Sequence, residues 1–251
     1  MSPPDFSLSG RRALVTGSSR GIGFALAQTL ASAGAHVILN GRNEATLSIA
    51  ETSMRSAGHS VAISAFDVTD ESAIAVAAAA FGPIDILVNN TGIHRRGPLE
   101  TMPLADWEAV LKTNLTSAFL MARAVAPGMI DRRRGKIINI CSVMSELARP
   151  TTGNYAAAKG GLKMLTRAMC AEWAQHNLQI NGIAPGYFLT ELNASLAADP
   201  KFDAWVKART PANRWGRVED LSGACVFLSS PAADFINGQI LTIDGGLTAV
   251  V

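Results

Sequence analysis

Short runs of apolar and β-branched residues recur along the chain, and longer segments compatible with helices separate them. These strand-like runs are residues 13–15, 36–39, 61–63, 84–88, 136–140, 179–183 and 239–243. Because most of them are continuously apolar rather than alternating, they are typical of strands buried on both faces. Their alternation with helical segments predicts a parallel sheet covered by helices on both sides. We therefore expect an α/β fold with a doubly wound parallel sheet of about seven strands.

The chain is 251 residues long, which suits one large α/β domain better than two small ones. No internal repeat and no linker rich in glycine and serine divides it. We expect a tail at residues 1–10 and a single domain at residues 11–251. The longest departure from the strand–helix alternation follows Pro185. It predicts a helical excursion near residues 186–217, over the carboxyl ends of the strands.

Charge and cysteine usage exclude several classes of protein. The formal net charge is +2, with both signs interspersed, so no basic face of the kind that nucleic acid requires is expected. No apolar run reaches the roughly 18 residues that a membrane span needs, and residues 1–10 lack the apolar segment of a signal peptide. The three cysteines lie far apart and lack ligand spacing, which favours buried free thiols over disulfides or a metal site. We expect a cytoplasmic protein without a metal, a nucleic-acid partner or a membrane.

A glycine-rich turn follows the first strand-like run and reads TGSSRGIG from Thr16 to Gly23. Glycines permit a tight turn and the close approach of a pyrophosphate, whose charge is attracted by free N–H groups at the start of the next helix. The spacing Gly-x-x-x-Gly-x-Gly differs from the commoner dinucleotide fingerprint, so the turn by itself is modest evidence for a Rossmann-type domain.

The same letters also satisfy Gly-x-Ser-x-Gly, the nucleophile elbow of α/β-hydrolases, with Ser19 at its centre. A triad could be drawn from Ser19, Asp85 and His176. A hydrolase elbow requires earlier strands and an oxyanion loop, however, and only a short segment precedes Gly17. The hydrolase is therefore the weaker hypothesis.

Tyr155 and Lys159 stand four residues apart in a segment that favours a helix, so their side chains share one face. Lowering a phenol pKa by about three units requires roughly 4 kcal/mol in favour of the phenolate. One positive charge about 4 Å away contributes on the order of 4 kcal/mol at an effective dielectric constant near 20. A lysine so placed could therefore activate the tyrosine as an acid or base, although an isolated pair of this kind is usually an ordinary feature of a helix surface.

This pair belongs to a larger ordered set, with Ser142 at the end of a strand-like run, Asn89-Asn90-Thr91-Gly92, Asn114, Pro185-Gly186 and Asp244-Gly245-Gly246. With these elements in order, the chain resembles the short-chain dehydrogenase/reductase family over nearly its whole length. The resemblance implies that Tyr155 donates the proton in reduction and accepts it in oxidation. It also implies that Lys159 binds the nicotinamide ribose and lowers the phenol pKa, that Ser142 holds the substrate oxygen, and that Asn114 positions a proton-relay water. The domain at 11–251 is then dinucleotide-binding and catalytic, and the enzyme is an oxidoreductase that moves a hydride between nicotinamide and an alcohol or ketone carbon.

Cofactor choice is indicated by the segment after the second strand-like run. An NAD site normally places an acid there on the ribose 2′-hydroxyl, and Asn40 takes the acid's place. Arg42 and Arg20 can donate to a 2′-phosphate, which favours NADP(H) over NAD(H). The full set of expected cofactor-binding residues, partly from the turn and partly from the resemblance, is Gly17, Ser19, Arg20, Gly21, Ile22, Gly23, Asn40, Arg42, Asp67, Val68, Asn90, Gly92, Tyr155, Lys159, Pro185, Gly186, Phe188 and Thr190.

Substrate recognition is indicated by paired arginines after the fourth strand-like run, since guanidinium groups suit a carboxylate. The expected substrate-binding residues are Arg95, Arg96, Ser142, Glu146, Arg149 and Tyr187. In its NNTGIHRRGPL and DGGLTA stretches the chain resembles gluconate 5-dehydrogenase members of the family, which implies gluconate and 5-ketogluconate as the substrate pair. A 3-ketoacyl carrier-protein reductase, or a non-catalytic NADP(H)-binding protein, are the alternatives. The resemblance further implies a homotetramer.

Overall fold

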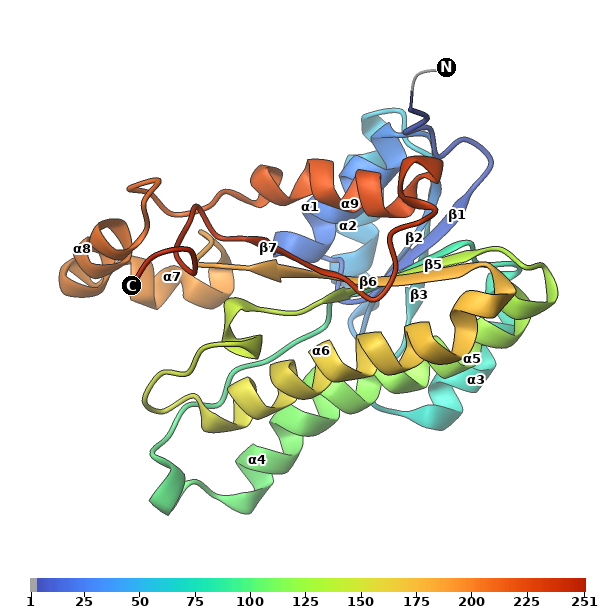
Figure 1. Cartoon of the computed structure of the whole chain (residues 1–251). Coiled ribbons are helices and arrows are strands. Elements are labelled where there is room, and N and C mark those ends of the chain that lie inside the picture. Colours follow the sequence, from blue (N-terminus) through green and yellow to red (C-terminus); the bar gives the residue numbers. More distant parts are fainter. Residues whose placement is uncertain (1–3) are drawn as a thin grey trace.

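A seven-stranded parallel sheet forms the centre of the computed structural model, which describes residues 4–251 (Figure 1). The strands are β1 (Arg12–Val15), β2 (His36–Gly41), β3 (Val61–Ala65), β4 (Ile86–Asn89), β5 (Gly135–Ile140), β6 (Leu178–Pro185) and β7 (Ile240–Ile243). Their order in the sheet is β3-β2-β1-β4-β5-β6-β7, so the direction of winding reverses between β1 and β4. The predicted doubly wound sheet is confirmed, and each predicted run overlaps one strand. The fourth run begins too early, because residues 84 and 85 precede β4.

Helices cover both faces of the sheet, as Figure 1 shows. One face packs α1 (Gly21–Ser32), α2 (Glu44–Ser56) and α9 (Ser222–Ser229). The other packs α3 (Glu71–Phe81), α5 (Ser117–Asp131) and α6 (Gly153–Trp173). The shorter α4 (Leu104–Leu111) leads into α5 through a π-helical turn, η2 (Lys112–Thr116).

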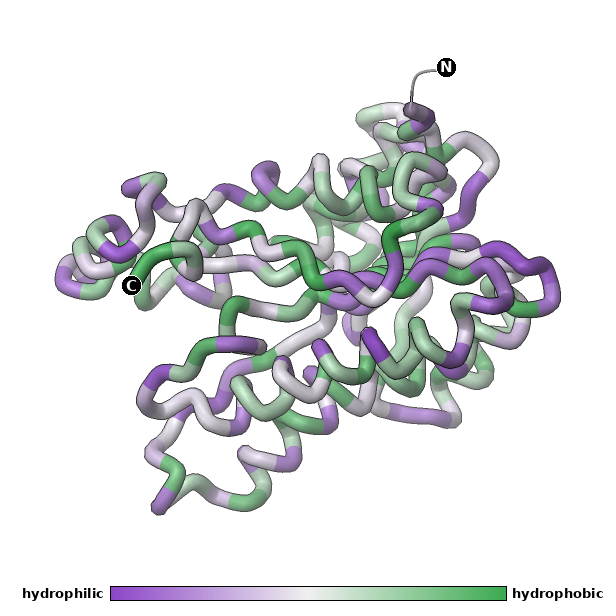
Figure 2. Tube along the Cα trace, in the orientation of Figure 1, coloured by the Kyte–Doolittle hydropathy of each residue, from purple (hydrophilic) through white to green (hydrophobic). Residues whose placement is uncertain are grey.

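Alternate residues of each central strand pack into the hydrophobic core on opposite faces of the sheet. In β1, Ala13 and Val15 pack on the α1 side, whereas Leu14 packs on the α5 side. In β4, Leu87 likewise lies on the α5 side, between neighbours that point to the other face. Figure 2 shows hydrophobic colour along the strands and hydrophilic colour in many of the peripheral connections. Burial of both strand faces explains why the runs read as continuously apolar.

The segment after β6 leaves the sheet and forms two helices, α7 (Ala194–Ala197) and α8 (Pro200–Arg209), before the chain returns to α9. A parallel bridge between Phe188 and Gly216 closes the base of this excursion. Its helices extend beyond the sheet in Figure 1. Among the described residues, no helix combines the length and apolarity that crossing a bilayer would take.

A chain of buried amides ties the strands to α6. Asn89 of β4 donates to Oδ1 of Asn139 in β5 at 2.8 Å, and Asn139 donates to the Thr166 hydroxyl of α6 at 2.8 Å. Thr166 is fully buried, and its hydroxyl in turn donates to the Leu162 carbonyl at 2.8 Å. Because a buried polar group without a partner costs free energy, this chain favours one position of α6 on the sheet.

Replacing Thr166 with valine keeps the shape of the side chain but leaves the buried Asn139 amide without its acceptor. We expect the free energy of unfolding to fall by roughly 1–3 kcal/mol, measured by urea denaturation. Thr52→Val is a matched control, since the Thr52 hydroxyl is exposed and bonds only the Ser48 carbonyl of its own helix. Equal stability losses in the two variants would contradict the structural role of the amide chain.

Candidate active site

A cleft of about 1250 Å³ opens at the carboxyl ends of the strands, where the winding of the sheet reverses. This volume exceeds the roughly 300–1,000 Å³ of common small-molecule pockets, so it suits a dinucleotide together with a second molecule. All residues predicted to bind the cofactor line this one cleft. Of the remaining predicted site residues, Asn114 and Glu146 do not line it.

The glycine turn presents free amides to the cleft. Gly17 and Gly21 have φ angles of +60° and +59°, which favour glycine, and α1 begins at Gly21, within the glycine-rich segment. The N-cap residue Arg20 makes no side-chain capping hydrogen bond, so the first amides of α1 stay available for an anion. Asn90 fixes the turn by donating to the carbonyls of Thr16 and Gly17 at 2.9 and 3.0 Å. This arrangement fits the pyrophosphate of a dinucleotide.

Asn40, predicted to take the place of the ribose-binding acid, lines the cleft, but its side chain already has partners in the protein. Asn40 is 1% exposed, and its amide donates to the carbonyls of Ser64 and Phe66, both at 3.2 Å. Its side chain is therefore occupied by backbone groups at the carboxyl end of β3, and its Oδ1 also accepts from the Gly17 amide at 3.4 Å. The next residue, Gly41, lines the cleft, and a Cβ added there would lie 3.8 Å from the Ser19 hydroxyl oxygen. Gly41 is thus the better position for a side chain that reads the ribose.

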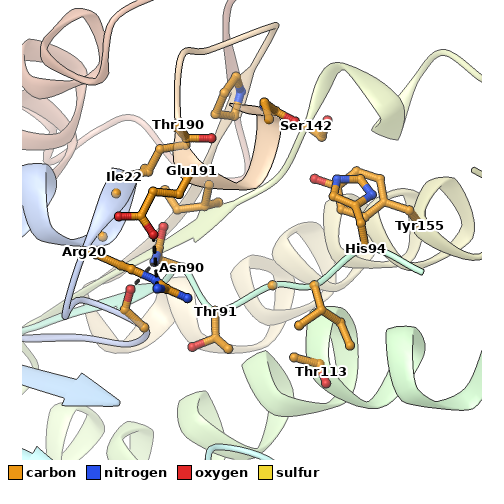
Figure 3. Close-up of a pocket in the computed structure, with 18 of the residues that line it drawn as sticks. Arg20, Ile22, Asn90, Thr91, His94, Thr113, Ser142, Tyr155, Thr190 and Glu191 are labelled. Carbon is orange, nitrogen blue, oxygen red and sulfur yellow. Dashed lines mark hydrogen bonds and ion pairs between the residues drawn. The ribbon is translucent and has the colours of Figure 1, made fainter. Parts of the chain in front are cut away.

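The two predicted phosphate-binding arginines both stand at the rim of the cleft. Arg20 pairs with Glu191 at 3.1 Å, across the mouth of the cleft, as Figure 3 shows. Arg42 lies 4.0 Å from Asp67. Their side chains are 75% and 80% exposed, so these surface pairs hold them weakly and leave both free to take an anionic partner.

Tyr155, Lys159 and Ser142 converge in the cleft, from α6 and from the loop after β5. Lys159 is buried, and its Nζ donates to the Ile140 carbonyl at 2.6 Å while lying 5.7 Å from the centre of the Tyr155 ring. Burial raises the pKa of Tyr155 to about 12, against the smaller opposing influences of Ser142 and Arg96. Sequence reasoning expected Lys159 to lower this pKa. The influences that lower it here come from Ser142 and Arg96 instead, while the Lys159 ammonium is bound to the Ile140 carbonyl.

Asn114 lies in the π-helical turn η2, buried beneath the loop that follows β4. Its Oδ1 accepts from the Ile93 amide at 2.8 Å and its Nδ2 donates to the Ile93 carbonyl at 2.9 Å. Both polar side-chain atoms are therefore engaged with the backbone of one residue. Asn114 therefore holds the loop after β4 in place. Its role in positioning a relay water stays a prediction.

The four predicted charged substrate residues separate into two pairs. Arg95 is committed to Asp106 at 2.7 Å, and Glu146 pairs with Lys163 outside the cleft, so the prediction for Glu146 is wrong. Arg96 and Arg149 line the cleft, and among the described residues neither takes part in an ion pair.

Arg149 is held by aromatic residues of the excursion. It donates to the Tyr187 hydroxyl at 3.3 Å and lies 4.5 Å from the centre of the Phe202 ring. Burial and the neighbouring Arg149 lower the pKa of Arg96, which indicates that the two guanidinium groups stand close together. Two cations that line the same cleft without an acidic partner form a site for an anion.

Sequence reasoning assigned no role to His94, which lines the cleft and stacks on the Tyr155 ring with centroids 3.8 Å apart (Figure 3). No periodicity or motif distinguishes His94 from the other residues of its loop. Only the approach of two segments that lie 61 positions apart reveals it.

Sequence comparison connects this geometry to characterised proteins. A family profile described as enoyl-(acyl carrier protein) reductase matches residues 17–248. A gluconate 5-dehydrogenase of Gluconobacter oxydans (strain 621H) is 54% identical and covers 99% of both chains. A 5-keto-D-gluconate 5-reductase of Escherichia coli (strain K12) is 48% identical and covers 98% of both chains. The chain belongs to the short-chain dehydrogenase/reductase family.

A solved structure agrees with this assignment. A gluconate 5-dehydrogenase from Burkholderia cenocepacia J2315, in complex with NADP and tartrate, is 52% identical, with a TM-score of 0.96 over 98% of each chain. The predicted family is confirmed, and the protein is an NAD(P)-dependent oxidoreductase that acts on CH–OH groups.

The hydrolase alternative fails for this short-chain dehydrogenase/reductase. Ser19 lies at the carboxyl ends of the strands, but Asp85 accepts from the Arg12 amide at 3.0 Å, at the amino end of β1. His176 lies in η4 (Ala174–His176), after α6, and does not line the cleft. The three residues do not form a triad.

Replacing Lys159 with methionine tests the cost of burying its charge. Burial lowers the pKa of Lys159 from 10.5 to about 8. For a base whose pKa folding lowers, the charged form costs stability below the folded pKa, and the cost disappears as the pH rises toward the unfolded value. From pH 7 to pH 10, wild-type stability should therefore rise by roughly 2 kcal/mol relative to Lys159→Met, measured by urea unfolding.

If the difference in the free energy of unfolding between wild type and Lys159→Met stays constant over this pH range, burial does not lower the pKa of Lys159. Lys201→Met, at an exposed lysine of α8, is the matched control. Both variants retain Tyr155. Its pKa of about 12 keeps the folded-state phenol protonated up to pH 10, and removing a nearby cation can only raise this pKa, so the phenol does not distinguish the three proteins.

Proposed function

We propose that this enzyme interconverts gluconate and 5-ketogluconate with NADP(H). The observation that carries the substrate proposal is the pair Arg96 and Arg149, two guanidinium groups in the cleft beside Tyr155 and without an acidic partner among the described residues. A sugar carboxylate would neutralise this pair while its carbon chain extends toward the phenol. The names of the relatives, which act on gluconate or its 5-keto acid, support the same choice.

The protein's own contribution to the reaction is the control of one proton. Tyr155 donates its phenol proton to the ketone oxygen in reduction and accepts a proton from the alcohol in oxidation. Ser142 holds the substrate oxygen, and its influence lowers the pKa of Tyr155 against the effect of burial. Lys159 adds positive charge that favours the phenolate and binds the ribose of the cofactor. The nicotinamide, when bound, takes up or supplies the hydride.

The preference for NADP(H) rests on charge at the rim. Arg20 and Arg42 are exposed beside the cleft, and a 2′-phosphate offers each a stronger acceptor than its weak surface partner. Gly41 leaves room there and supplies no acid to repel the phosphate.

Residues 186–217 act in this proposal as the substrate-binding excursion of a catalytic domain that spans 11–251, preceded by a tail at 1–10. Tyr187 and Phe202 connect the excursion to Arg149, so its position and the anion site depend on each other. Closure of this segment would also exclude water from the reacting groups.

We further propose assembly as a homotetramer in the cytoplasm. An apolar groove runs along α5 and α6, where Phe119 and Met164 are exposed. A second apolar surface lies at the edge strand β7, with Leu241 exposed, and at the C-terminal Val250 and Val251. Two separate self-complementary faces on one chain generate a tetramer with dihedral symmetry. Three free cysteines suit a reducing compartment.

Removing Arg96 or Arg149 should lower the catalytic efficiency of the enzyme on sugar acids. We expect Arg96→Met and Arg149→Met each to lower kcat/KM for gluconate about 10- to 150-fold, the value of a charge-assisted contact, with little effect on sorbitol. Arg95→Met is the matched control, because Arg95 is already paired with Asp106. Tyr155→Phe provides the inactive blank.

Equal treatment of gluconate and sorbitol by all of these variants would refute the carboxylate site. Faster turnover of acetoacetyl thioesters than of any keto acid by the wild type would favour the ketoacyl reductase instead. Turnover of any substrate excludes the non-catalytic alternative.

Cofactor preference should respond to Gly41 and not to Asn40. Gly41→Asp combined with Arg42→Ala puts a carboxylate at the ribose and removes a phosphate donor, so the ratio of kcat/KM for NADPH over NADH should fall about 10- to 150-fold. Asn40→Asp buries a carboxylate against two carbonyls and should instead destabilise the protein. An unchanged ratio in the double variant would show that this turn does not distinguish the cofactors.

A further inference from the structure

His94 stands at a fixed place in the cleft, between two anchored residues. Asn114 holds both the amide and the carbonyl of Ile93, at 2.8 and 2.9 Å. On the other side, Asn154 of α6 donates to the Arg95 carbonyl at 2.8 Å. The His94 side chain is therefore positioned by the backbone on both sides.

The imidazole lies against the face of the reacting tyrosine. The two rings are stacked with an interplanar angle of 26° and centroids 3.8 Å apart. Figure 3 shows one imidazole nitrogen beside the phenol oxygen, at the end of the tyrosine ring that lies away from its backbone. A substrate oxygen bonded to Tyr155 therefore places the substituents of the neighbouring carbons beside this ring.

Both imidazole nitrogens are unused within the described residues. Nδ1 is sealed from solvent without a partner, and no hydrogen bond involves Nε2, which is not sealed. Buried donors without partners are rarer than buried acceptors without partners, so we assign the ring proton to Nε2. The ring then offers one N–H donor to the cleft.

The imidazole is also neutral, which suits it to a hydroxyl rather than to a carboxylate. Burial and the cations Arg96, Lys159 and Arg149 lower the pKa of His94 to about 4. A phenylalanine would stack on Tyr155 equally well and would avoid a buried nitrogen among three cations. The presence of a histidine is therefore explained by a hydrogen bond that the protein itself does not satisfy.

We propose that His94 is a specificity-determining residue whose Nε2–H donates to a substrate hydroxyl on a carbon adjacent to the reacting carbon. This assignment rests on the proposed function, because it requires a polyhydroxy acid bound with its reacting oxygen at Tyr155. In 5-ketogluconate, the reacting carbon has a hydroxyl-bearing neighbour on each side, at C4 and at C6. Vicinal oxygens lie about one hydrogen-bond length apart, which matches adjacent donors on Tyr155 and His94.

The test combines His94→Phe, which keeps the stacked ring and removes its nitrogens, with 5-ketogluconate and its 4-deoxy and 6-deoxy analogues. We expect the substitution to lower kcat/KM for 5-ketogluconate about 10- to 50-fold, as the loss of one recognised hydroxyl contact. For one of the two deoxy analogues the loss should be at least fivefold smaller, because the hydroxyl and the nitrogen act as a pair. His176→Phe, at a histidine outside the cleft, is the matched control.

If His94→Phe lowers kcat/KM equally for 5-ketogluconate and both deoxy analogues, the proposal is overturned and His94 only packs against Tyr155. His94→Gln supplies a second readout, since it keeps an N–H donor without the ring and should retain dependence on the same hydroxyl. NADPH affinity and the melting temperature of each variant separate these effects from misfolding. A wild type that reduces no sugar keto acid would refute the proposed function, and the assignment of His94 would be overturned with it.

Discussion

The active site depends on one buried ammonium group. A charge removed from water is tolerated only where hydrogen bonds replace the solvent, and Lys159 has the Ile140 carbonyl at the end of β5. This contact fixes the position of α6 relative to the sheet, and therefore the height of Tyr155, one helical turn earlier, above the strand ends. The amide chain from Asn89 to Thr166 supports the same placement from the interior.

The environment of Tyr155 is set by opposing influences. Desolvation raises the pKa of the phenol, whereas Ser142 and Arg96 lower it. A phenol that stays protonated is a ready donor for reduction, and added positive charge is needed before it serves as a base. In the proposed function, proton transfer in both directions therefore depends on the charge that bound ligands bring to the cleft.

Three cations surround that phenol, and the protein provides no acid to balance them among the described residues. Arg96, Arg149 and Lys159 all lower the pKa of His94, and Arg149 also lowers the pKa of Arg96, so positive charges repel one another in a poorly hydrated space. Such repulsion costs stability in the protein alone and is relieved when anionic ligands enter. The excursion contributes through Tyr187 and Phe202, which hold Arg149 toward the cleft. In the proposed function, substrate charge and the position of the excursion are therefore linked through Arg149.

The sequence alone determined the sheet, the glycine turn and the shared helix face of Tyr155 and Lys159, and the family resemblance added Ser142 to them. Periodicity reports burial directly, and a spacing of four residues fixes a helix face whatever surrounds it. Only the tertiary structure decided which polar atoms remain free. Asn40 and Arg95 read as ligand-binding residues, yet backbone carbonyls at the end of β3 engage the first and Asp106 the second. His94 gained significance only from its contact with Tyr155 across 61 positions, because a partner so distant in sequence leaves no local pattern.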